Sequence, residues 1–249
     1  MGNSEVPPDS PVYQAVLHYY AREGGGYKSG SAEAVRLIHS LIKMNHYYDP
    51  DIGLMNRLMY AYSKTGNLNS AIDVWRSILI NKIPFNNVTI SIIMDVYGYS
   101  GEFGRAATLW ESLKMQQSNE QVYEINKKNL ESFIEAACRT GNVSRAIEEC
   151  FKALEWKDGA LVDQDTLKLL LKFTRSDSQA FHSLRERIQK ELPHYWPLVE
   201  NVAQPKGLSG NTSETQRKTS FNFSSLANKN RENSAIQVND PNDISLQKP

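Results

Sequence analysis

Side chains that could carry out chemistry are present in this chain of 249 residues, but their spacing builds no catalytic motif. The five histidines are scattered along the chain, at His18, His39, His46, His182 and His194, and none belongs to an HxE or HExxH zinc pattern. Cys138 and Cys150 are twelve residues apart, which fits no CxxC metal or redox motif and is typical of small core side chains. The sequence also lacks a GxSxG turn and a phosphate-binding glycine loop. We therefore expect no enzyme, catalytic residue, metal, cofactor or small-molecule substrate.

A short sequence motif that recurs three times shows where the helices of the chain are expected. Its glycines, Gly66, Gly101 and Gly141, are separated by 35 and 40 residues. Each glycine is followed five residues later by an alanine, at Ala71, Ala106 and Ala146. A period of this length, with helical spacing on both sides of a glycine turn, predicts a stacked array of helix hairpins.

The repeat that begins at Ile52 shows how one hairpin is encoded. Its first apolar stripe is made of Leu54, Met55, Leu58, Met59 and Tyr62, and its second of Ala71, Val74, Trp75, Ile78 and Leu79. This spacing places each set on one face of a helix. Between them, Gly66 can end the first helix in the left-handed conformation and Asn67 can cap the second. Pro84 then stops the hairpin.

Two further copies repeat this arrangement, and degenerate copies flank the array. The next copies carry Ile90, Ile93, Met94 and Tyr97 before Leu109, Trp110 and Leu113, and Leu130, Phe133, Ile134 and Ala137 before Ile147, Cys150 and Leu154. The upstream copy is expected to bury Tyr13, Val16, Leu17 and Tyr20, then Ala34, Leu37, Ile38 and Leu41. The downstream copy is expected to bury Leu167, Leu170, Leu171 and Phe173, then Phe181, Leu184 and Ile188. The predicted fold class is all-α, a helix-hairpin repeat solenoid that forms an α-α superhelix.

The predicted domain organisation has four parts. A lead-in covers residues 1–9, the array covers 10–190 and is most regular over 52–154, and a docking segment covers 191–204. The apolar residues of the docking segment are Tyr195, Trp196, Leu198 and Val199. In residues 205–249, Ser, Asn, Lys and Gln dominate, so a disordered tail is expected there.

The net charge, the apolar runs and the N-terminus of the chain indicate which partners and which cellular locations to expect. Lys and Arg together number 28, as do Asp and Glu, so no global positive field attracts nucleic acid. No apolar run approaches the ~18 residues of a membrane span, and no membrane contact is expected. The N-terminus resembles neither a signal peptide nor a mitochondrial leader. The helical pattern begins by about Val12, which is typical of a fragment or of a gene model that lacks its start.

The repeats resemble those of the pentatricopeptide repeat family. That family has an aliphatic or aromatic first helix, then Lys-x-Gly, an alanine, a bulky residue, and Ile-x-Pro-Asp/Asn before the next copy. Lys64-Thr-Gly66, Ala71, Trp75 and Ile83-Pro-Phe-Asn86 are similar to this pattern. Tetratricopeptide repeats fit less well, because Trp75 and Trp110 lie in second helices.

The resemblance implies single-stranded RNA binding, with one base read by each repeat. In the family, the fifth residue of a repeat and the last residue before the next form the reading pair. The corresponding pairs are Gln14 with Asp51, Asn56 with Asn86, Ser91 with Asn126, and Glu131 with Asp163. Asn56/Asn86 is similar to pyrimidine-reading pairs and Ser91/Asn126 to an adenine-reading pair, whereas the acidic pairs would repel phosphate. Val88 occupies the position whose side chain sandwiches a base, a position that Gly53 and Lys128 fit poorly. All these residues could equally line a solvated helix edge.

Basic side chains gather in one repeat and are candidate phosphate contacts. Between Ile52 and Asn86 these are Arg57, Lys64, Arg76 and Lys82, against the single acid Asp73. The alternative interpretation is an ordinary solvated face. Tyr60 and Tyr99 could stack on a base or contact a partner helix, or they could pack against the adjacent repeat.

Two functional hypotheses follow from these observations. The first is a single-stranded RNA-binding adaptor in organellar RNA processing, stability or translation, with a mitochondrial location implied by the family resemblance alone. The second is a protein-binding scaffold of the same architecture without RNA readout, which the neutral charge favours.

Overall fold

The computed structural model describes residues 8–24, 30–44, 51–118, 124–156 and 159–202, and these form an all-α structure. Within these ranges the chain forms helices connected by short turns and contains no strand. The predicted tail at 205–249, most of the lead-in and the last two residues of the docking segment lie outside the described residues.

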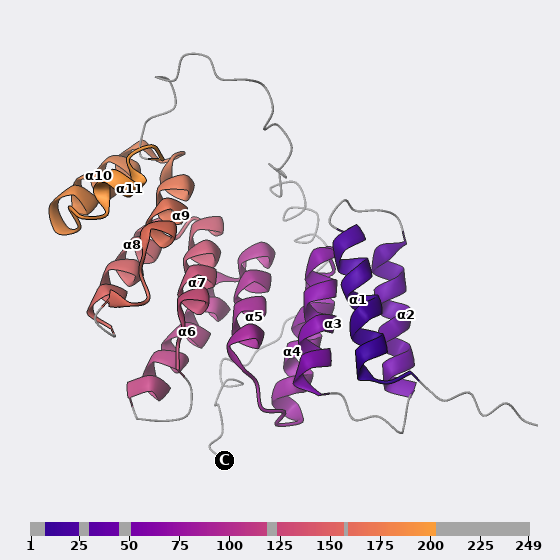
Figure 1. Ribbon diagram of the computed structural model, residues 1–249. Coiled ribbons are helices and arrows are strands. Elements are labelled where there is room, and N and C mark those ends of the chain that lie inside the picture. The colour runs from indigo at the N-terminus through magenta and orange to yellow at the C-terminus, as the bar shows by residue number, and fades with distance from the viewer. Residues whose placement is uncertain (1–7, 25–29, 45–50, 119–123, 157–158, 203–249) are drawn as a thin grey trace, which may run out of the picture. The chain divides into compact units, whose positions relative to one another are not determined.

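The helices follow one another as antiparallel pairs (Figure 1). Their bounds are Ser10–Gly24 (α1), Ser31–Met44 (α2), Ile52–Lys64 (α3), Leu68–Ile80 (α4), Asn87–Ser100 (α5), Phe103–Ser118 (α6), Lys127–Arg139 (α7), Val143–Lys152 (α8), Gln164–Thr174 (α9), Ser178–Glu191 (α10) and Trp196–Val199 (α11). A 3₁₀ turn, Ala153–Glu155, follows α8. The chain divides into two compact units, Met1–Val96 and Tyr97–Pro249, and each is described below by itself.

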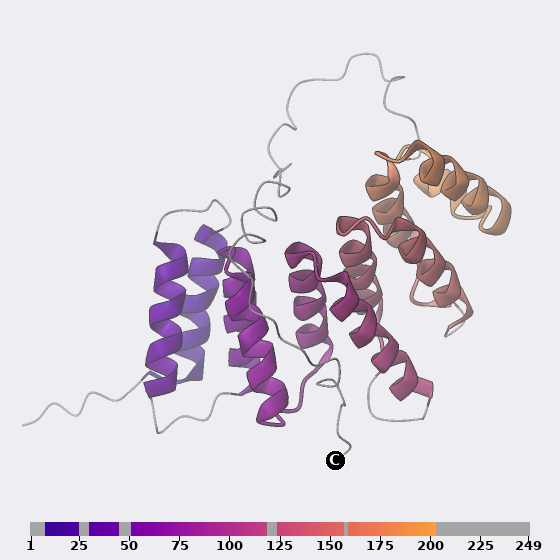
Figure 2. The same ribbon diagram turned by 180° about the vertical axis from the view of Figure 1, so that it is seen from behind.

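In the first unit, α3 is the central element. It packs against α1 and α2 of the preceding hairpin and against its own partner α4, and both sides of this packing can be followed in Figures 1 and 2. Leu54, Leu58 and Met59 on α3 are each no more than 1% exposed. On α4, Trp75 is buried and meets Phe85 edge to face, with ring centroids 5.4 Å apart.

In the second unit, α7 packs against α6, α8 and α9. Helix α10 packs against α8 and α9, and α11 packs on α9. The fully buried Trp110 of α6 stacks on Phe133 of α7, with ring centroids 4.8 Å apart. Its indole N–H donates to Oε2 of Glu149 on α8 at 2.8 Å. Glu149 is completely buried and also bonds Lys114 at 3.1 Å and Arg145 at 3.0 Å. A buried carboxylate is tolerated in this core because every side of it meets a donor.

The three repeated glycines end their helices as the sequence predicts. Gly66, Gly101 and Gly141 have φ of 78°, 77° and 82°. At the first of these turns, Asn67 N donates to Tyr62 O at 2.9 Å and Gly66 N to Ser63 O at 3.2 Å. These two bonds form the Schellman arrangement, which needs a residue free to adopt positive φ.

The small and bulky residues that follow the glycines lie in the core. Ala71, Ala106 and Ala146 have no exposed surface, nor have Trp110 and Cys150. Asn67 caps α4 as predicted, accepting from Ser70 N at 3.4 Å. Asn142 differs at the equivalent place, because its side chain donates to Thr140 and makes no cap bond to α8.

The prediction of the buried apolar residues in the upstream copy is partly wrong. Leu37 is 62% exposed, Leu41 47% and Val16 38%, although all three were assigned to the core. The side of α2 that is buried instead carries Ser31, Val35, Ile38 and Ile42. Periodicity correctly finds apolar positions, but it does not show whether a neighbouring element covers them.

Neither cysteine has the environment of a reactive thiol. Cys150 is buried and Cys138 half-buried, and burial raises the pKa of each thiol to about 12. Among the described residues, no group of three or more His, Cys, Asp or Glu side chains could hold a metal ion. None of the described helices is long and apolar enough to cross a membrane.

Candidate nucleic-acid interface

Asn56 and Asn86, the predicted pyrimidine-reading pair, lie within hydrogen-bond distance of each other. Asn56 lies on α3 and Asn86 immediately precedes α5. Nδ2 of Asn56 donates to Oδ1 of Asn86 at 3.4 Å. The fold therefore brings together two amides that are thirty residues apart in the sequence, and both lie in the first unit.

The start of α5 fixes the orientation of both amides. Oδ1 of Asn86 accepts from the backbone N–H groups of Val88 at 3.0 Å and Thr89 at 3.1 Å. This oxygen must face the helix, so only the nitrogen of Asn56 can face Asn86 without repulsion. Oδ1 of Asn56 is then left buried with no hydrogen-bond partner among the described residues, on a residue that is 6% exposed. A buried carbonyl in this state costs about 1–3 kcal/mol and would be stabilised by a ligand that donates to it.

Val88 lies beside this amide pair. Its side chain is large and apolar, and it is 57% exposed. An exposed aliphatic side chain next to hydrogen-bonding groups offers a surface on which a flat ring could lie. The structure therefore places the sandwiching candidate and one reading pair together.

The pair Gln14 and Asp51 is connected through a third residue. Nε2 of Gln14 donates to Ser10 Oγ at 2.9 Å, and Ser10 Oγ donates to Asp51 Oδ2 at 2.8 Å. The other oxygen of Asp51 accepts from Leu54 N at 2.7 Å and caps α3. Both oxygens of this carboxylate are thus engaged within the protein.

The pair Glu131 and Asp163 is bridged by a lysine. Lys127 Nζ bonds Asp163 Oδ2 and lies 3.6 Å from Glu131 Oε1. Burial raises the pKa of Asp163, but the bond from Lys127 and those from the backbone of Thr166 and Asp165 outweigh it, and the net pKa is lowered. The same bond raises the pKa of Lys127, because it stabilises the charged form of the lysine. Both members of this predicted reading pair are therefore engaged in ion pairs with Lys127.

Ser91 and Asn126 fall in different compact units, so each is described alone. Ser91 on α5 is 8% exposed. Asn126 caps α7, with Oδ1 accepting from Asn129 N at 2.9 Å, and Asn129 returns a bond to the backbone of Asn126. This reciprocal arrangement is a capping box built from two asparagines.

The last residue of each repeat shares one role that the sequence analysis missed. Asp51, Asn86, Asn126 and Asp163 all accept backbone N–H bonds at the start of the next first helix. The signal was available, because Asp or Asn directly before an apolar helical stripe is the preferred N-cap. The residue type at this position is therefore explained by capping before any base is considered.

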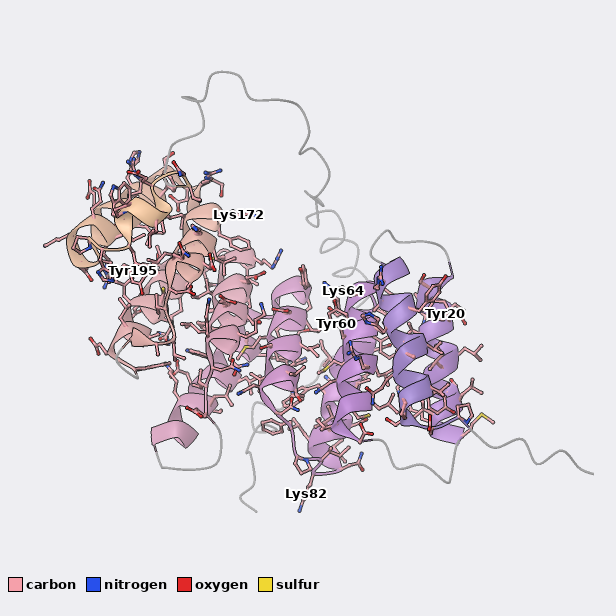
Figure 3. All side chains as sticks on the ribbon, viewed as in Figure 1. Tyr20, Tyr60, Lys64, Lys82, Lys172 and Tyr195 are labelled. Atoms are coloured by element: carbon pink, nitrogen blue, oxygen red, sulfur yellow. The ribbon has the colours of Figure 1, made fainter. Side chains whose placement is uncertain are left out.

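The four basic candidates do not form a single patch. Arg57 and Lys64 lie on α3, Arg76 lies on α4, and Lys82 follows α4. Figure 3 shows Lys64 and Lys82 at opposite ends of the α3–α4 hairpin. Arg76 pairs with Asp73 at 3.0 Å, and Arg57 lies 3.4 Å from Nδ1 of His18. Only Arg57 and Lys64, two turns apart on one helix, are placed to follow the same strand of a ligand.

Cationic and aromatic groups also meet near the ends of first helices. Lys64 Nζ lies 5.2 Å from the ring centroid of the half-exposed Tyr60. In the second unit, the guanidinium of Arg139 on α7 lies between Tyr99 of α5 and Phe173 of α9, at 4.4 and 5.3 Å. Sequence reasoning considered Tyr99 but missed Arg139 and Phe173, whose contact depends on three separate helices.

Comparisons with known proteins identify the fold. A scan against models of protein families finds no match, and neither does a search of curated proteins. A search of solved structures finds pentatricopeptide repeat protein PPR10 in complex with an 18-nt psaJ RNA element, with a TM-score of 0.56 and 20% identity over 73% of this chain. A cysteine-to-serine variant of that complex gives the same values.

PPR10 from maize is similar as well, with a TM-score of 0.50 and 17% identity over 82% of this chain. These matches cover only 25% of the RNA-bound PPR10 chain and 36% of the maize PPR10 chain. The repeated glycine turns, the paired helices and these matches agree, and the chain has a pentatricopeptide-repeat-like fold.

Proposed function

We propose that this chain binds single-stranded RNA along its first helices and acts as an adaptor in organellar RNA processing, stability or translation. The observation that carries the proposal is the buried carbonyl of Asn56 beside Asn86 and Val88, for which the described part of the chain supplies no hydrogen-bond partner. The fold supports it, because PPR10, which has a similar fold, was solved in complex with RNA.

The geometry around Asn56 suits a pyrimidine. A base edge that presents an N–H donor would satisfy Asn56 Oδ1, and Asn86 keeps an amide nitrogen able to donate to a base carbonyl. The exposed side chain of Val88 would contact the face of the ring. Arg57 and Lys64 on the same helix would neutralise phosphates. Each such contact makes the slope of log binding constant against log salt concentration more negative by about 0.7.

The test is selection from a random pool of single-stranded RNA, followed by binding measurements on variants. We expect an enriched motif with a pyrimidine next to an adenine, and a loss of about tenfold in affinity for that motif in Asn56→Ala. Asn86→Ser keeps the cap but removes the amide, so it should relax the preference at the pyrimidine without unfolding α5.

Two controls separate readout from folding. Asn69 is exposed on α4, and Asn69→Ala should leave both affinity and preference unchanged. Arg57→Gln should weaken all sequences equally and reduce the salt slope. If Asn56→Ala binds the selected RNA as tightly as the parent chain does, the assignment of the reading pair is wrong.

A protein-binding scaffold is the second candidate function, and the cluster around Lys127 favours it. Two carboxylates, Glu131 and Asp163, occupy a reading position there. Because Lys127 holds both carboxylates, this position offers a base no free reading group, which favours the candidate without RNA readout. A selection that enriches no RNA motif would favour this candidate.

A mitochondrial location is part of the proposal and rests on the family resemblance. Expression of the complete coding sequence with a C-terminal fluorescent protein tests it. Fluorescence confined to mitochondria would support the location, and fluorescence spread through the cytosol would contradict it.

A further inference from the structure

The residue that begins a first helix lies beside the reading residue of the same repeat. Helices α1, α3 and α7 each carry their predicted reading residue four positions after their first residue. Residues four apart lie on the same face of a helix, so the two side chains are neighbours. The three neighbouring pairs are Ser10/Gln14, Ile52/Asn56 and Lys127/Glu131.

At the start of α1, Ser10 connects both members of the reading pair. Its Oγ accepts from Nε2 of Gln14 and donates to Oδ2 of Asp51. The other oxygen of Asp51 accepts from the N–H of Leu54 and caps α3. One atom of Asp51 is therefore used by the cap and the other by Ser10.

At the start of α7, Lys127 has the same role in the second unit. Its Nζ bonds Oδ2 of Asp163 and lies 3.6 Å from Oε1 of Glu131. Oδ1 of Asp163 accepts from the backbone of Asp165 and Thr166 and caps α9. The arrangement at Ser10 thus occurs a second time, with a different residue type and in a different unit.

The repeat that begins at Ile52 lacks this connection, because isoleucine has no hydrogen-bonding side chain. Its reading residues Asn56 and Asn86 contact each other directly, at 3.4 Å. Oδ1 of Asn86 caps α5, which leaves Nδ2 to donate. Oδ1 of Asn56 has no hydrogen-bond partner among the described residues. This pair can therefore present a donor and an acceptor to a base edge.

We propose that the first residue of a first helix decides whether its repeat reads a base, and that Ser10 and Lys127 silence the repeats that they begin. The proposal rests on the proposed function, in which each repeat faces one base of a single strand. The base opposite Asn56 and Asn86 is then specified. The bases opposite Gln14/Asp51 and Glu131/Asp163 pass unread.

The chemistry of Lys127 makes it a strong competitor of a base. A base edge offers neutral N–H donors, whereas the ammonium group makes a charge-assisted bond to Asp163 and lies close to Glu131. Displacing it would also leave these two carboxylates without their shared cation beside the RNA phosphates. Ser10 makes only a hydroxyl bond to Asp51, so its silencing is expected to be weaker.

The test is selection from a random single-stranded RNA pool with the full parent chain and with Lys127→Met, which loses the ammonium group. In the parent, we expect no base preference two nucleotides from the pyrimidine, beyond the adenine. In Lys127→Met, the freed carboxylates should disfavour uracil there about fivefold or more. Uracil is disfavoured because its one N–H on that edge lies between two carbonyl oxygens, which a carboxylate repels.

The readout is the base preference at this nucleotide, because freed acids lower the affinity for every RNA. Lys127→Arg keeps a cation between the two acids and should keep the nucleotide unread. Lys168→Met is the matched control. Lys168 is 34% exposed, against 37% for Lys127, but it pairs with Asp165 instead. Its substitution should leave every preference unchanged.

A second variant tests the other silent repeat. Ser10→Ala frees Gln14 and the second oxygen of Asp51 while the cap on α3 stays. A preference should then appear at the nucleotide next to the pyrimidine on the side away from the adenine. This variant keeps the test decisive if Lys127→Met fails to fold.

The outcomes separate this proposal from RNA binding itself. A base already specified opposite Glu131 and Asp163 in the parent overturns the proposal. So do variants that fold but leave both nucleotides unspecified. In these cases the pyrimidine opposite Asn56 and Asn86 is still enriched and the proposed function stands. A parent chain that enriches no motif at all overturns the proposed function, and this proposal with it.

Discussion

Gly98 on α5 and Ala136 on α7 approach so closely that no side chain fits between them. A Cβ atom placed on Gly98 would lie 2.7 Å from Cα of Ala136 and 3.0 Å from its Cβ. Both residues are fully buried or nearly so, and both belong to the second unit. The contact is between the backbone of one first helix and that of the next, so neither side can yield by rotating a side chain.

Gly98→Ala is therefore expected to destabilise the protein. The added methyl group must push two helix backbones apart, which typically costs about 1–3 kcal/mol in a packed core. Chemical denaturation followed by circular dichroism measures the effect. Gly104→Ala is the matched control, because Gly104 lies in α6 and nothing stands within 4 Å of its added Cβ. Equal stability of the two variants would contradict the close approach.

Gly141→Ala tests the turn rather than the packing. Nothing lies within 4 Å of a Cβ added there, but φ is +82°. The loss should be about 1 kcal/mol and purely conformational, since L residues with a side chain resist this region. The same substitution at Gly104, inside a helix, should instead be neutral or stabilise by about 0.5 kcal/mol. A Gly141→Ala protein as stable as the parent would show that the turn tolerates a side chain.

Glu149→Ala should be among the most damaging single changes in the second unit. It leaves the indole N–H of Trp110 buried without an acceptor, and Lys114 and Arg145 lose their buried partner and keep Glu111. Removing one partner of a buried ion pair typically costs about 3–5 kcal/mol. Glu148→Ala is the control, because Glu148 is half-exposed and shares Arg145 with the network but accepts no bond from Trp110 or Lys114. A small difference between the two in thermal melting would show that the buried network contributes little.

Stability should fall in mild acid because of His39. Burial, with a smaller contribution from Lys43, lowers the pKa of His39 from 6.5 to about 4, and Nδ1 lies 2.9 Å from the hydroxyl of Tyr62. In the unfolded chain the ring takes up a proton near pH 6.5, whereas in the folded chain it resists protonation until about pH 4. The unfolded state thus binds more protons between these values, so stability is greatest above pH 6.5 and declines toward pH 4.

His39→Gln removes this titration, and its melting temperature should depend less on pH over that window than that of the parent. His182→Gln is the comparison, at an exposed histidine of α10. Parallel pH profiles for the parent and His39→Gln would rule out His39 as the source of the acid sensitivity.

The fold could be predicted from the sequence wherever one residue type has one structural use. The positive φ of Gly66, Gly101 and Gly141 follows from their place after helical stripes, and the burial of Ala71 follows from the need for close packing. The exposure of Leu37 and Leu41 could not be predicted, because periodicity reports which positions are apolar and not whether a neighbour covers them.

The candidate site was only partly accessible for a related reason. Counting along the repeats found Asn56 and Asn86, which the fold does bring together. It did not reveal that Lys127 sits between Glu131 and Asp163, or that Ser10 connects Gln14 to Asp51. These connections depend on side chains outside the counted positions, and on rotamers that only the packed helices determine.

The caps at Asp51, Asn86, Asn126 and Asp163 have a consequence for redesign. Each of these side chains holds the first amides of the following helix. A designer who wished to change the ligand preference of a repeat could not vary this position through all twenty amino acids, since most would release those amides. Only Asp, Asn, Ser and Thr would keep the cap at this position. Most of any new specificity would therefore have to come from substitutions of the partner residue on the first helix.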